Sequence, residues 1–234
     1  MSTRALLLLA AGVSLAGCEA DPREANGGFP VAGRPVAPIV SDRFSTEDAR
    51  DRIGEAEAVM ELAGVMPGMS VADIGAGEGY YTIRLAKLVG EGGRVLAQDI
   101  VPETRDALAR RVQREDLDNV SVRLGASADP RLPERSFDRI FLVHMYHEVT
   151  EPYEFLWNLR EGLRQGGEIV VVDADRPIQR HGMPPALLDC EFESVGMERI
   201  RMAPVPGADA YFAAYRIAAE RPEPRDIETC DIDA

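Results

Sequence analysis

The chain has 234 residues and a formal net charge of −14, with 45% hydrophobic and 28% charged residues. This length and composition are typical of one globular domain with tails, and they leave little room for a second domain. Because strong negative charge repels the phosphate backbone and no basic stripe offsets it, the sequence argues against a nucleic-acid partner.

The first 18 residues form a segment of their own. A single cation, Arg4, precedes an apolar run that is too short to span a bilayer comfortably and is typical of a secretory signal. The run ends in Leu15-Ala16-Gly17-Cys18, which resembles the lipidation site of bacterial lipoproteins. The resemblance implies that Cys18 carries lipid and that the mature protein is anchored to a membrane, on the periplasmic side of the cell envelope. If the leader is not used, the protein is cytoplasmic.

Two further segments flank the domain that we expect at residues 45–219. Residues 19–44 are rich in proline, glycine and alanine and have no apolar period, which predicts a flexible linker. Residues 220–234 are acidic and predict a disordered tail. Because Cys190 falls in an expected helix and Cys230 in this tail, we expect two free thiols rather than a disulfide.

Between these segments, strand-like and helix-like patterns alternate. Ser45 and Asp48 are typical of a capping box, and they open a helix that stops before Pro67. The run 168–175 is apolar on both faces, as in a buried parallel sheet. The alternation predicts a doubly wound α/β sheet. The expected strands are 71–74, 94–99, 119–124, 137–143, 168–175, 197–202 and 210–217, and the expected later helices are 80–89, 102–114, 151–164 and 184–195.

A glycine-rich loop, DIGAGEG at 73–79, follows the first strand and precedes a helix. Its glycines leave the backbone open to a ligand, and the helix offers free N–H groups. The spacing G-x-G-x-G differs from the dinucleotide fingerprint G-x-G-x-x-G, so a nicotinamide-dependent oxidoreductase is disfavoured. Asp99 ends the second strand, where a carboxylate can accept both hydroxyls of a ribose. Loop and acid together indicate an adenosine-containing ligand.

The stretch DIGAGEGYYT, together with Asp99, resembles the class I methyltransferases that use S-adenosylmethionine (SAM). The likeness continues through residues 124–149 and 159–175 and covers about residues 53–217 in all. It implies a Rossmann-like, mostly parallel seven-stranded sheet, with SAM as the cofactor. It also implies contacts of the methionine part with Asp73, Gly75, Ala76, Gly77 and Gly79, of the ribose with Asp99 and Ile100, and of the adenine with Ala128 and Asp129.

The three histidines of the chain lie in segments that follow expected strands. In open sheets such segments border the ligand crevice. We expect His147 to act as a general base, with Tyr146, Glu148 and His181 lining the acceptor pocket and His144 in the core. No metal is expected, because the HxxHE spacing on a strand end would splay the side chains. The less favoured metal alternative would use His144, His147, Glu148, Asp173, Asp175 and His181.

These features predict a SAM-dependent methyltransferase for a small-molecule acceptor. Only a short segment, 176–183, separates the fifth strand from the next helix, which leaves no room for the insertions typical of enzymes that modify large substrates. The stretch GYYT is similar to protein isoaspartyl methyltransferases, but residues 125–133 replace their glycine-rich segment and argue against protein repair. The alternative is a methyltransferase-like lipoprotein that binds SAM or a nucleotide without turnover, because SAM is made in the cytoplasm.

Overall fold

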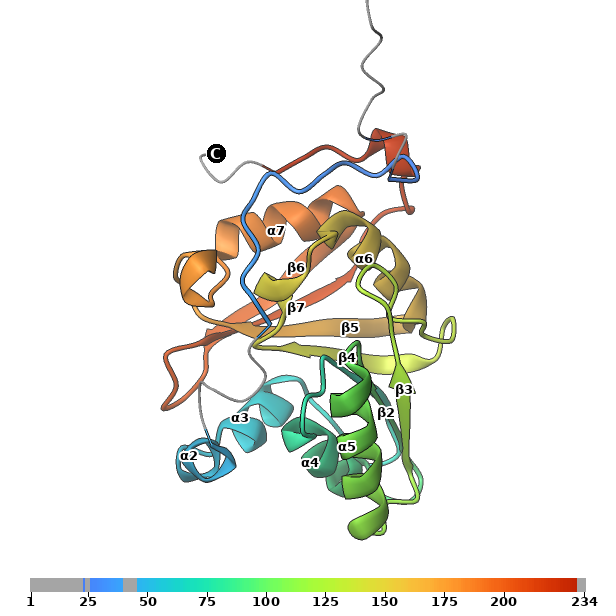
Figure 1. Ribbon diagram of the computed structural model, residues 1–234, viewed down its shortest axis with the longest axis vertical. Helices are drawn as coiled ribbons and strands as arrows, with labels where there is room; N and C mark the ends of the chain where they lie inside the picture. Colours follow the sequence, from blue (N-terminus) through green and yellow to red (C-terminus); the bar gives the residue numbers. More distant parts are fainter. Residues whose placement is uncertain (1–22, 24–25, 40–45, 231–234) are drawn as a thin grey trace, which may run out of the picture.

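The computed structural model describes Arg23, residues 26–39 and residues 46–230 (Figure 1). The expected leader with Cys18 lies outside the described residues, and so does Ser45. No helix in the described part of the chain is long and apolar enough to cross a membrane.

Seven strands form one sheet in the order β3-β2-β1-β4-β5-β7-β6. The neighbouring strands among β1–β5 pair in parallel, and β7 is antiparallel to both of its neighbours, so β6 runs in the same direction as β1–β5. The predicted doubly wound, mostly parallel seven-stranded sheet is therefore confirmed. The strands are β1 Ser70–Ile74, β2 Arg94–Asp99, β3 Val120–Leu124, β4 Phe137–Val143, β5 Leu163–Asp173, β6 Met197–Pro204 and β7 Tyr211–Ile217.

Helices cover both faces of this sheet (Figure 1). One face packs against α3, α4 and α5, and the other packs against α6 and α7. Alternate residues of the central strands enter the two cores, because successive strand side chains point to opposite faces. The helices are α2 Glu47–Arg52, α3 Glu55–Leu62, α4 Tyr80–Val89, α5 Pro102–Arg114, α6 Pro152–Leu159 and α7 Pro185–Ser194, with 3-10 turns η1 Tyr146–Glu148, η2 Arg160–Gly162, η3 Ile178–Arg180 and η4 Pro224–Asp226.

Two of the expected helices differ from the sequence prediction by more than one residue at a boundary. The first helix is capped by Thr46, whose side chain accepts a hydrogen bond from the Ala49 amide at 3.3 Å. A left-handed Gly54, with φ +63°, then divides it into α2 and α3. The helix expected at 151–164 ends at Leu159, because the chain from Leu163 onward pairs with β4.

The prediction of a flexible linker is wrong for residues 26–39. Phe29 is buried and packs edge-on against Trp157 of α6, with ring centroids 5.5 Å apart. Arg34 is buried and its Nε lies 2.6 Å from Glu191 Oε1 of α7. The Ala37 amide donates a hydrogen bond to the His147 carbonyl at 3.1 Å. These anchors are single side chains at irregular spacing, so they leave no periodic signal in the sequence.

The prediction of a disordered tail is wrong for residues 220–230. Cys190 of α7 and Cys230 form a disulfide, so the expectation of two free thiols is also wrong. The Cys230 amide donates to the Tyr153 hydroxyl at 2.6 Å, and Ile227 is buried. This segment lies beside residues 26–39 at the top of Figure 1, where Arg23 donates to the Arg225 carbonyl at 3.0 Å. The disulfide forms because the tail folds back over α6 and α7.

Candidate active site

The glycine loop turns at the carboxyl edge of the sheet, between β1 and α4. Gly77 has φ +55°, and a Cβ added there would meet no atom within 4 Å, so the backbone faces open space. Gly79 has φ +91°, and its added Cβ would lie 2.4 Å from Leu108 Cδ1 of α5. Glycine at 77 therefore gives a ligand access to the backbone, whereas glycine at 79 allows α4 and α5 to pack closely.

Asp99 holds this loop against the end of β2. Its Oδ2 accepts a hydrogen bond from the Gly77 amide at 3.1 Å, and its Oδ1 accepts one from the Val101 amide at 2.9 Å. Because each carboxylate oxygen can accept more than one hydrogen bond, both oxygens can still accept from a ribose diol. The loop and Asp99 thus fit the adenosine part of SAM.

Asp73 is a second acid at this edge, and it is almost completely buried. Thr82 Oγ1 of α4 donates to its Oδ2 at 2.6 Å. Burial raises the pKa of Asp73 to about 6, since the charged form is poorly solvated. A cation bound beside it would favour the charged form, and SAM carries a positively charged sulfonium.

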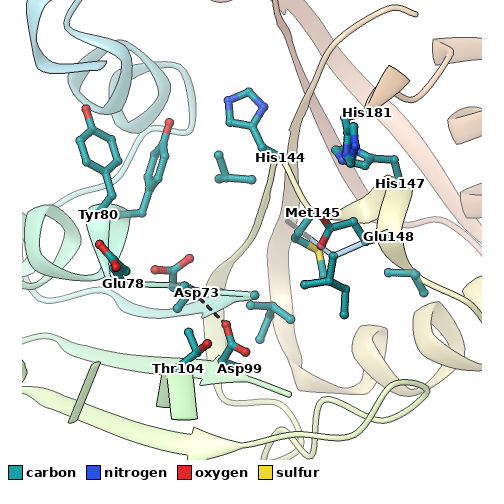
Figure 2. Close-up of a pocket in the computed structure, with 18 of the residues that line it drawn as sticks. Asp73, Glu78, Tyr80, Asp99, Thr104, His144, Met145, His147, Glu148 and His181 are labelled. Atoms are coloured by element: carbon teal, nitrogen blue, oxygen red, sulfur yellow. Dashed lines mark hydrogen bonds between the residues drawn. The ribbon is translucent and has the colours of Figure 1, made fainter. Parts of the chain in front are cut away.

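A cavity of about 780 Å³ opens between this loop and the segment after β4. Figure 2 shows Asp73 and Asp99 on one side of it and the pair His147 and His181 on the other. Most of the residues predicted for the site line this cavity: Asp73, Gly75, Ala76, Gly77, Asp99, Ile100, His147, Glu148 and His181. Their contacts with ligands stay predictions.

Four residues predicted for the site do not line the cavity, and Gly79 is one of them. Tyr146 is buried between α6 and α7, where its hydroxyl donates to Glu191 Oε2 at 2.7 Å. The carbonyl of Ala128 accepts from Asn158 Nδ2 at 3.0 Å, and Asp129 Oδ1 accepts from the Arg131 amide at 2.7 Å. Both residues are thus held in the turn after β3, and the preceding Ala126 and Ser127 line the cavity instead.

His147 forms a buried pair with Asp173, the last residue of β5. Its Nδ1 lies 2.8 Å from Asp173 Oδ2, and the Ala174 amide holds the other carboxylate oxygen at 2.8 Å. Because a carboxylate only accepts hydrogen bonds, Nδ1 carries the proton and Nε2 is the free acceptor nitrogen. From the sequence, Asp173 was expected only as a ligand in the less favoured metal alternative. No signal in the sequence marked this pairing, because the strand was expected to continue to Asp175, whereas β5 ends at Asp173.

His144 was expected in the core, but its side chain is 37% exposed. It lies at the rim of the cavity, with Nε2 3.4 Å from Glu55 Oε1. The reason is its backbone: with φ +53°, His144 already belongs to the turn after β4 and not to the strand.

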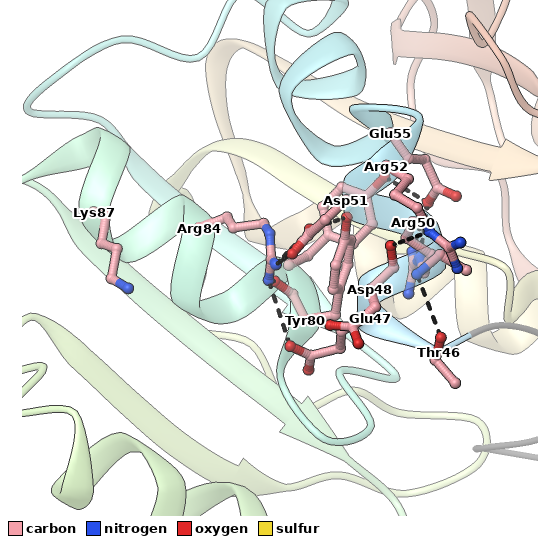
Figure 3. Close-up of polar contacts among 12 residues, drawn as sticks. Thr46, Glu47, Asp48, Arg50, Asp51, Arg52, Glu55, Tyr80, Arg84 and Lys87 are labelled. Atoms are coloured by element: carbon pink, nitrogen blue, oxygen red, sulfur yellow. Dashed lines mark hydrogen bonds and ion pairs between the residues drawn. The ribbon is translucent and has the colours of Figure 1, made fainter.

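At the rim of the cavity, His144 meets a polar cluster formed by side chains from α2, α3 and α4 (Figure 3). Glu55 Oε1 accepts from Arg50 Nη2 at 2.6 Å and from the Tyr81 hydroxyl at 3.1 Å. Burial would raise the pKa of Glu55, but hydrogen bonds from His144 and Arg50 lower it to about 2. Arg50 and Arg84 lie over the Tyr80 ring, at 3.9 and 3.8 Å from its centroid. No sequence pattern indicated this cluster, because the cluster depends on contacts between separate helices.

Comparisons with known proteins agree with this arrangement of a glycine loop at the carboxyl edge of a seven-stranded sheet. Residues 71–167 match a family model described as a methyltransferase domain. A crystal structure of a SAM-dependent methyltransferase from Aquifex aeolicus is 27% identical, with a TM-score of 0.65; the match covers 71% of this chain and 90% of that one. The fold is that of the class I methyltransferases.

Two curated relatives match over shorter stretches. A protein-L-isoaspartate O-methyltransferase from Methanopyrus kandleri is 30% identical over 154 residues, which are 58% of this chain and 66% of the relative. A ubiquinone/menaquinone biosynthesis C-methyltransferase UbiE from Citrobacter koseri is 31% identical over 126 residues, which are 51% of this chain and 48% of the relative. The chain thus spans about half to two thirds of these relatives. Together the comparisons support a SAM-dependent methyltransferase domain whose cofactor is SAM.

Proposed function

We propose that this protein transfers a methyl group from SAM to a small-molecule acceptor. One observation carries the proposal: a single cavity joins the glycine loop and Asp99 on one side to the buried His147–Asp173 pair on the other. A cofactor on the loop and an acceptor beside His147 would therefore share one space. Holding both partners in line is the main task of an enzyme for this displacement.

When bound, SAM would supply a sulfonium methyl carbon for displacement by the acceptor's lone pair, with the sulfur as leaving group that keeps the electron pair. Asp99 accepts hydrogen bonds from the ribose diol, and ionised Asp73 offsets the positive charge of the ligand. His147 Nε2 takes the proton of an acceptor hydroxyl. Asp173 acts as a positioning residue: it orients the imidazole through Nδ1 and stabilises the imidazolium that forms.

The size and surroundings of the cavity favour a small acceptor. Its volume of about 780 Å³ is within the usual range of small-ligand sites, and the cofactor would occupy part of it. Residues 26–39 pack along α6 and α7 and reach the cavity at Ile39, which narrows the approach for a folded protein substrate. The curated relatives include enzymes named for a protein acceptor and for quinone biosynthesis, so the acceptor class needs a direct test.

Product formation distinguishes the enzyme from a protein that binds SAM without turnover. The protein is incubated with methyl-labelled SAM and a cell extract divided by size into small molecules and proteins. We expect label in the small-molecule fraction and release of S-adenosylhomocysteine, and we expect His147→Ala to reduce both while SAM binding is kept. Binding of SAM without S-adenosylhomocysteine would favour the non-catalytic alternative. Label in the protein fraction would overturn the acceptor class.

We further propose that the protein lies on the periplasmic side of the cell envelope, anchored by lipid at Cys18. The leader sequence supports this, and so does the Cys190–Cys230 disulfide, because disulfides persist mainly in oxidising compartments. Labelling cells with radioactive palmitate tests the anchor: label should be present in the membrane-associated protein and absent from Cys18→Ser. Equal labelling of both proteins, or of neither, would contradict the proposal.

A further inference from the structure

Three side chains from two distant segments converge at the acceptor end of the cavity. One nitrogen of His147, one nitrogen of His181 and one carboxylate oxygen of Glu148 all lie within 4.8 Å of one another. The ligand atoms of a tetrahedral zinc site lie roughly 3.5 Å apart, so small side-chain rotations would bring these three onto a shared ion. We infer that His147, Glu148 and His181 bind a divalent transition-metal ion. Two imidazoles and a carboxylate are ligands suited to Zn²⁺ or Fe²⁺.

The local backbone explains why these side chains converge rather than splay. From the sequence, no metal was expected, because HxxHE was predicted to lie on a strand end. In the structure β4 ends at Val143, and His147 and Glu148 belong to the 3-10 turn η1 that follows. His181 comes from the segment after β5, where it ends turn η3 with φ +55°, and Arg176 Nε donates to its carbonyl at 3.1 Å. Figure 2 shows His147 and His181 side by side.

The His147–Asp173 pair is a second, independent observation that points to an ion. Metal-binding histidines nearly always donate their other ring N–H to a carboxylate or carbonyl, which fixes the ring and its tautomer. Asp173 does this for His147, with Nδ1 and Oδ2 2.8 Å apart and both residues buried. The carboxylates of Glu148 and Asp173 would balance the two positive charges of the ion. Asp173 is therefore expected to be a positioning residue whether His147 acts as a general base or as a metal ligand.

An ion held by three protein ligands keeps a coordination position open, as in catalytic zinc sites. Here that position would face the cavity, so the acceptor class is one that carries an oxygen able to ligate the ion, such as a hydroxyl or an enol. With the ion bound, His147 Nε2 is a ligand, and the ion replaces it as the group that favours loss of the acceptor's proton, which passes to water. This role in the reaction rests on the proposed function, but ion binding itself does not require SAM.

Titration with Co²⁺ tests the site, because bound Co²⁺ absorbs visible light according to its ligands. The full protein is first treated with EDTA, then titrated with Co²⁺, and Zn²⁺ is added to displace it. We expect one ion per chain, at least tenfold weaker binding in Glu148→Gln and in Asp173→Asn, and loss of the absorption bands in His181→Ala. His144→Ala, which changes the histidine at the rim, is the matched control and should bind like the wild type.

Thermal unfolding of each variant shows whether it is folded. If His181→Ala does not fold, the conservative variants Glu148→Gln and Asp173→Asn still test the site. Wild-type affinity in the Glu148 and His181 variants, or no bands in the wild type, would overturn the inference. A SAM titration of the same samples separates the two proposals. Binding of SAM without Co²⁺ would refute only the metal site, whereas binding of Co²⁺ without SAM would refute only the methyltransferase function.

Discussion

Asp73 should make SAM binding depend on pH between about 5 and 7, because burial raises the pKa of this carboxyl to about 6. SAM is cationic, so it favours the ionised carboxylate. If one group of pKa about 6 must be ionised, the observed Kd is about tenfold higher at pH 5 than at pH 7, which is about 1.4 kcal/mol of binding free energy. Asp73→Asn removes the charge and should give a weaker Kd that no longer changes over this range.

The same shift has a consequence for stability, with a defined sign. The folded-state pKa of Asp73 is raised, so the neutral form stabilises the fold fully below the unfolded pKa of about 3.9, and this contribution is lost as pH rises through about 6. The shift is worth about 3 kcal/mol, so without ligand Asp73→Asn should be more stable than the wild type at pH 7 and nearly equal at pH 4.

Calorimetric titrations of SAM at pH 5, 6, 7 and 8, with both proteins, provide the assay. The asparagine variant is the control for every other group that titrates in this range. Parallel pH profiles for the two proteins, or tighter wild-type binding at pH 5 than at pH 7, would refute the reasoning.

Two further predictions concern the framework around the site. Gly79→Ala should lower the free energy of unfolding by about 2–4 kcal/mol, because the added Cβ would lie 2.4 Å from Leu108 Cδ1. Gly77→Ala should lower it by only about 1–2 kcal/mol, because the added Cβ meets no atom and only the backbone is strained. Urea unfolding that finds the Gly77 variant less stable than the Gly79 variant would contradict the packing role of Gly79. Replacing Cys190 and Cys230 by serine should lower the free energy of unfolding by about 4 kcal/mol, because the disulfide closes a sequence separation of 40 residues. A variant with the same melting temperature as the oxidised wild type would show that the disulfide contributes nothing to stability.

Much of the fold could be predicted because its signals are local. The strand at 94–99 and the helices at 80–89 and 102–114 begin and end as expected, since glycine or proline marks an end of each segment and their apolar periods are regular. The meeting of the glycine loop with Asp99 was predictable for the same reason: a glycine loop and a strand-ending acid must meet at the carboxyl edge of a parallel sheet.

The remaining features depend on contacts that no local pattern encodes. Tyr146 and His147 are neighbours, yet the turn η1 sends one into the core and the other to the cavity. The Cys190–Cys230 disulfide likewise depends on segments that pack only after the sheet and its helices have formed.

The central claim is that the glycine loop and Asp99 bind SAM, and a calorimetric titration of SAM into the purified protein tests it most directly. Asp99→Ala removes the acceptor of the Gly77 and Val101 amides and should weaken SAM binding about 10- to 150-fold, the loss expected from one hydrogen bond to a charged group. NAD should not bind, and circular dichroism should show that the variant is folded. Failure of the wild type to bind SAM, or equal SAM affinity in folded Asp99→Ala, would contradict the account.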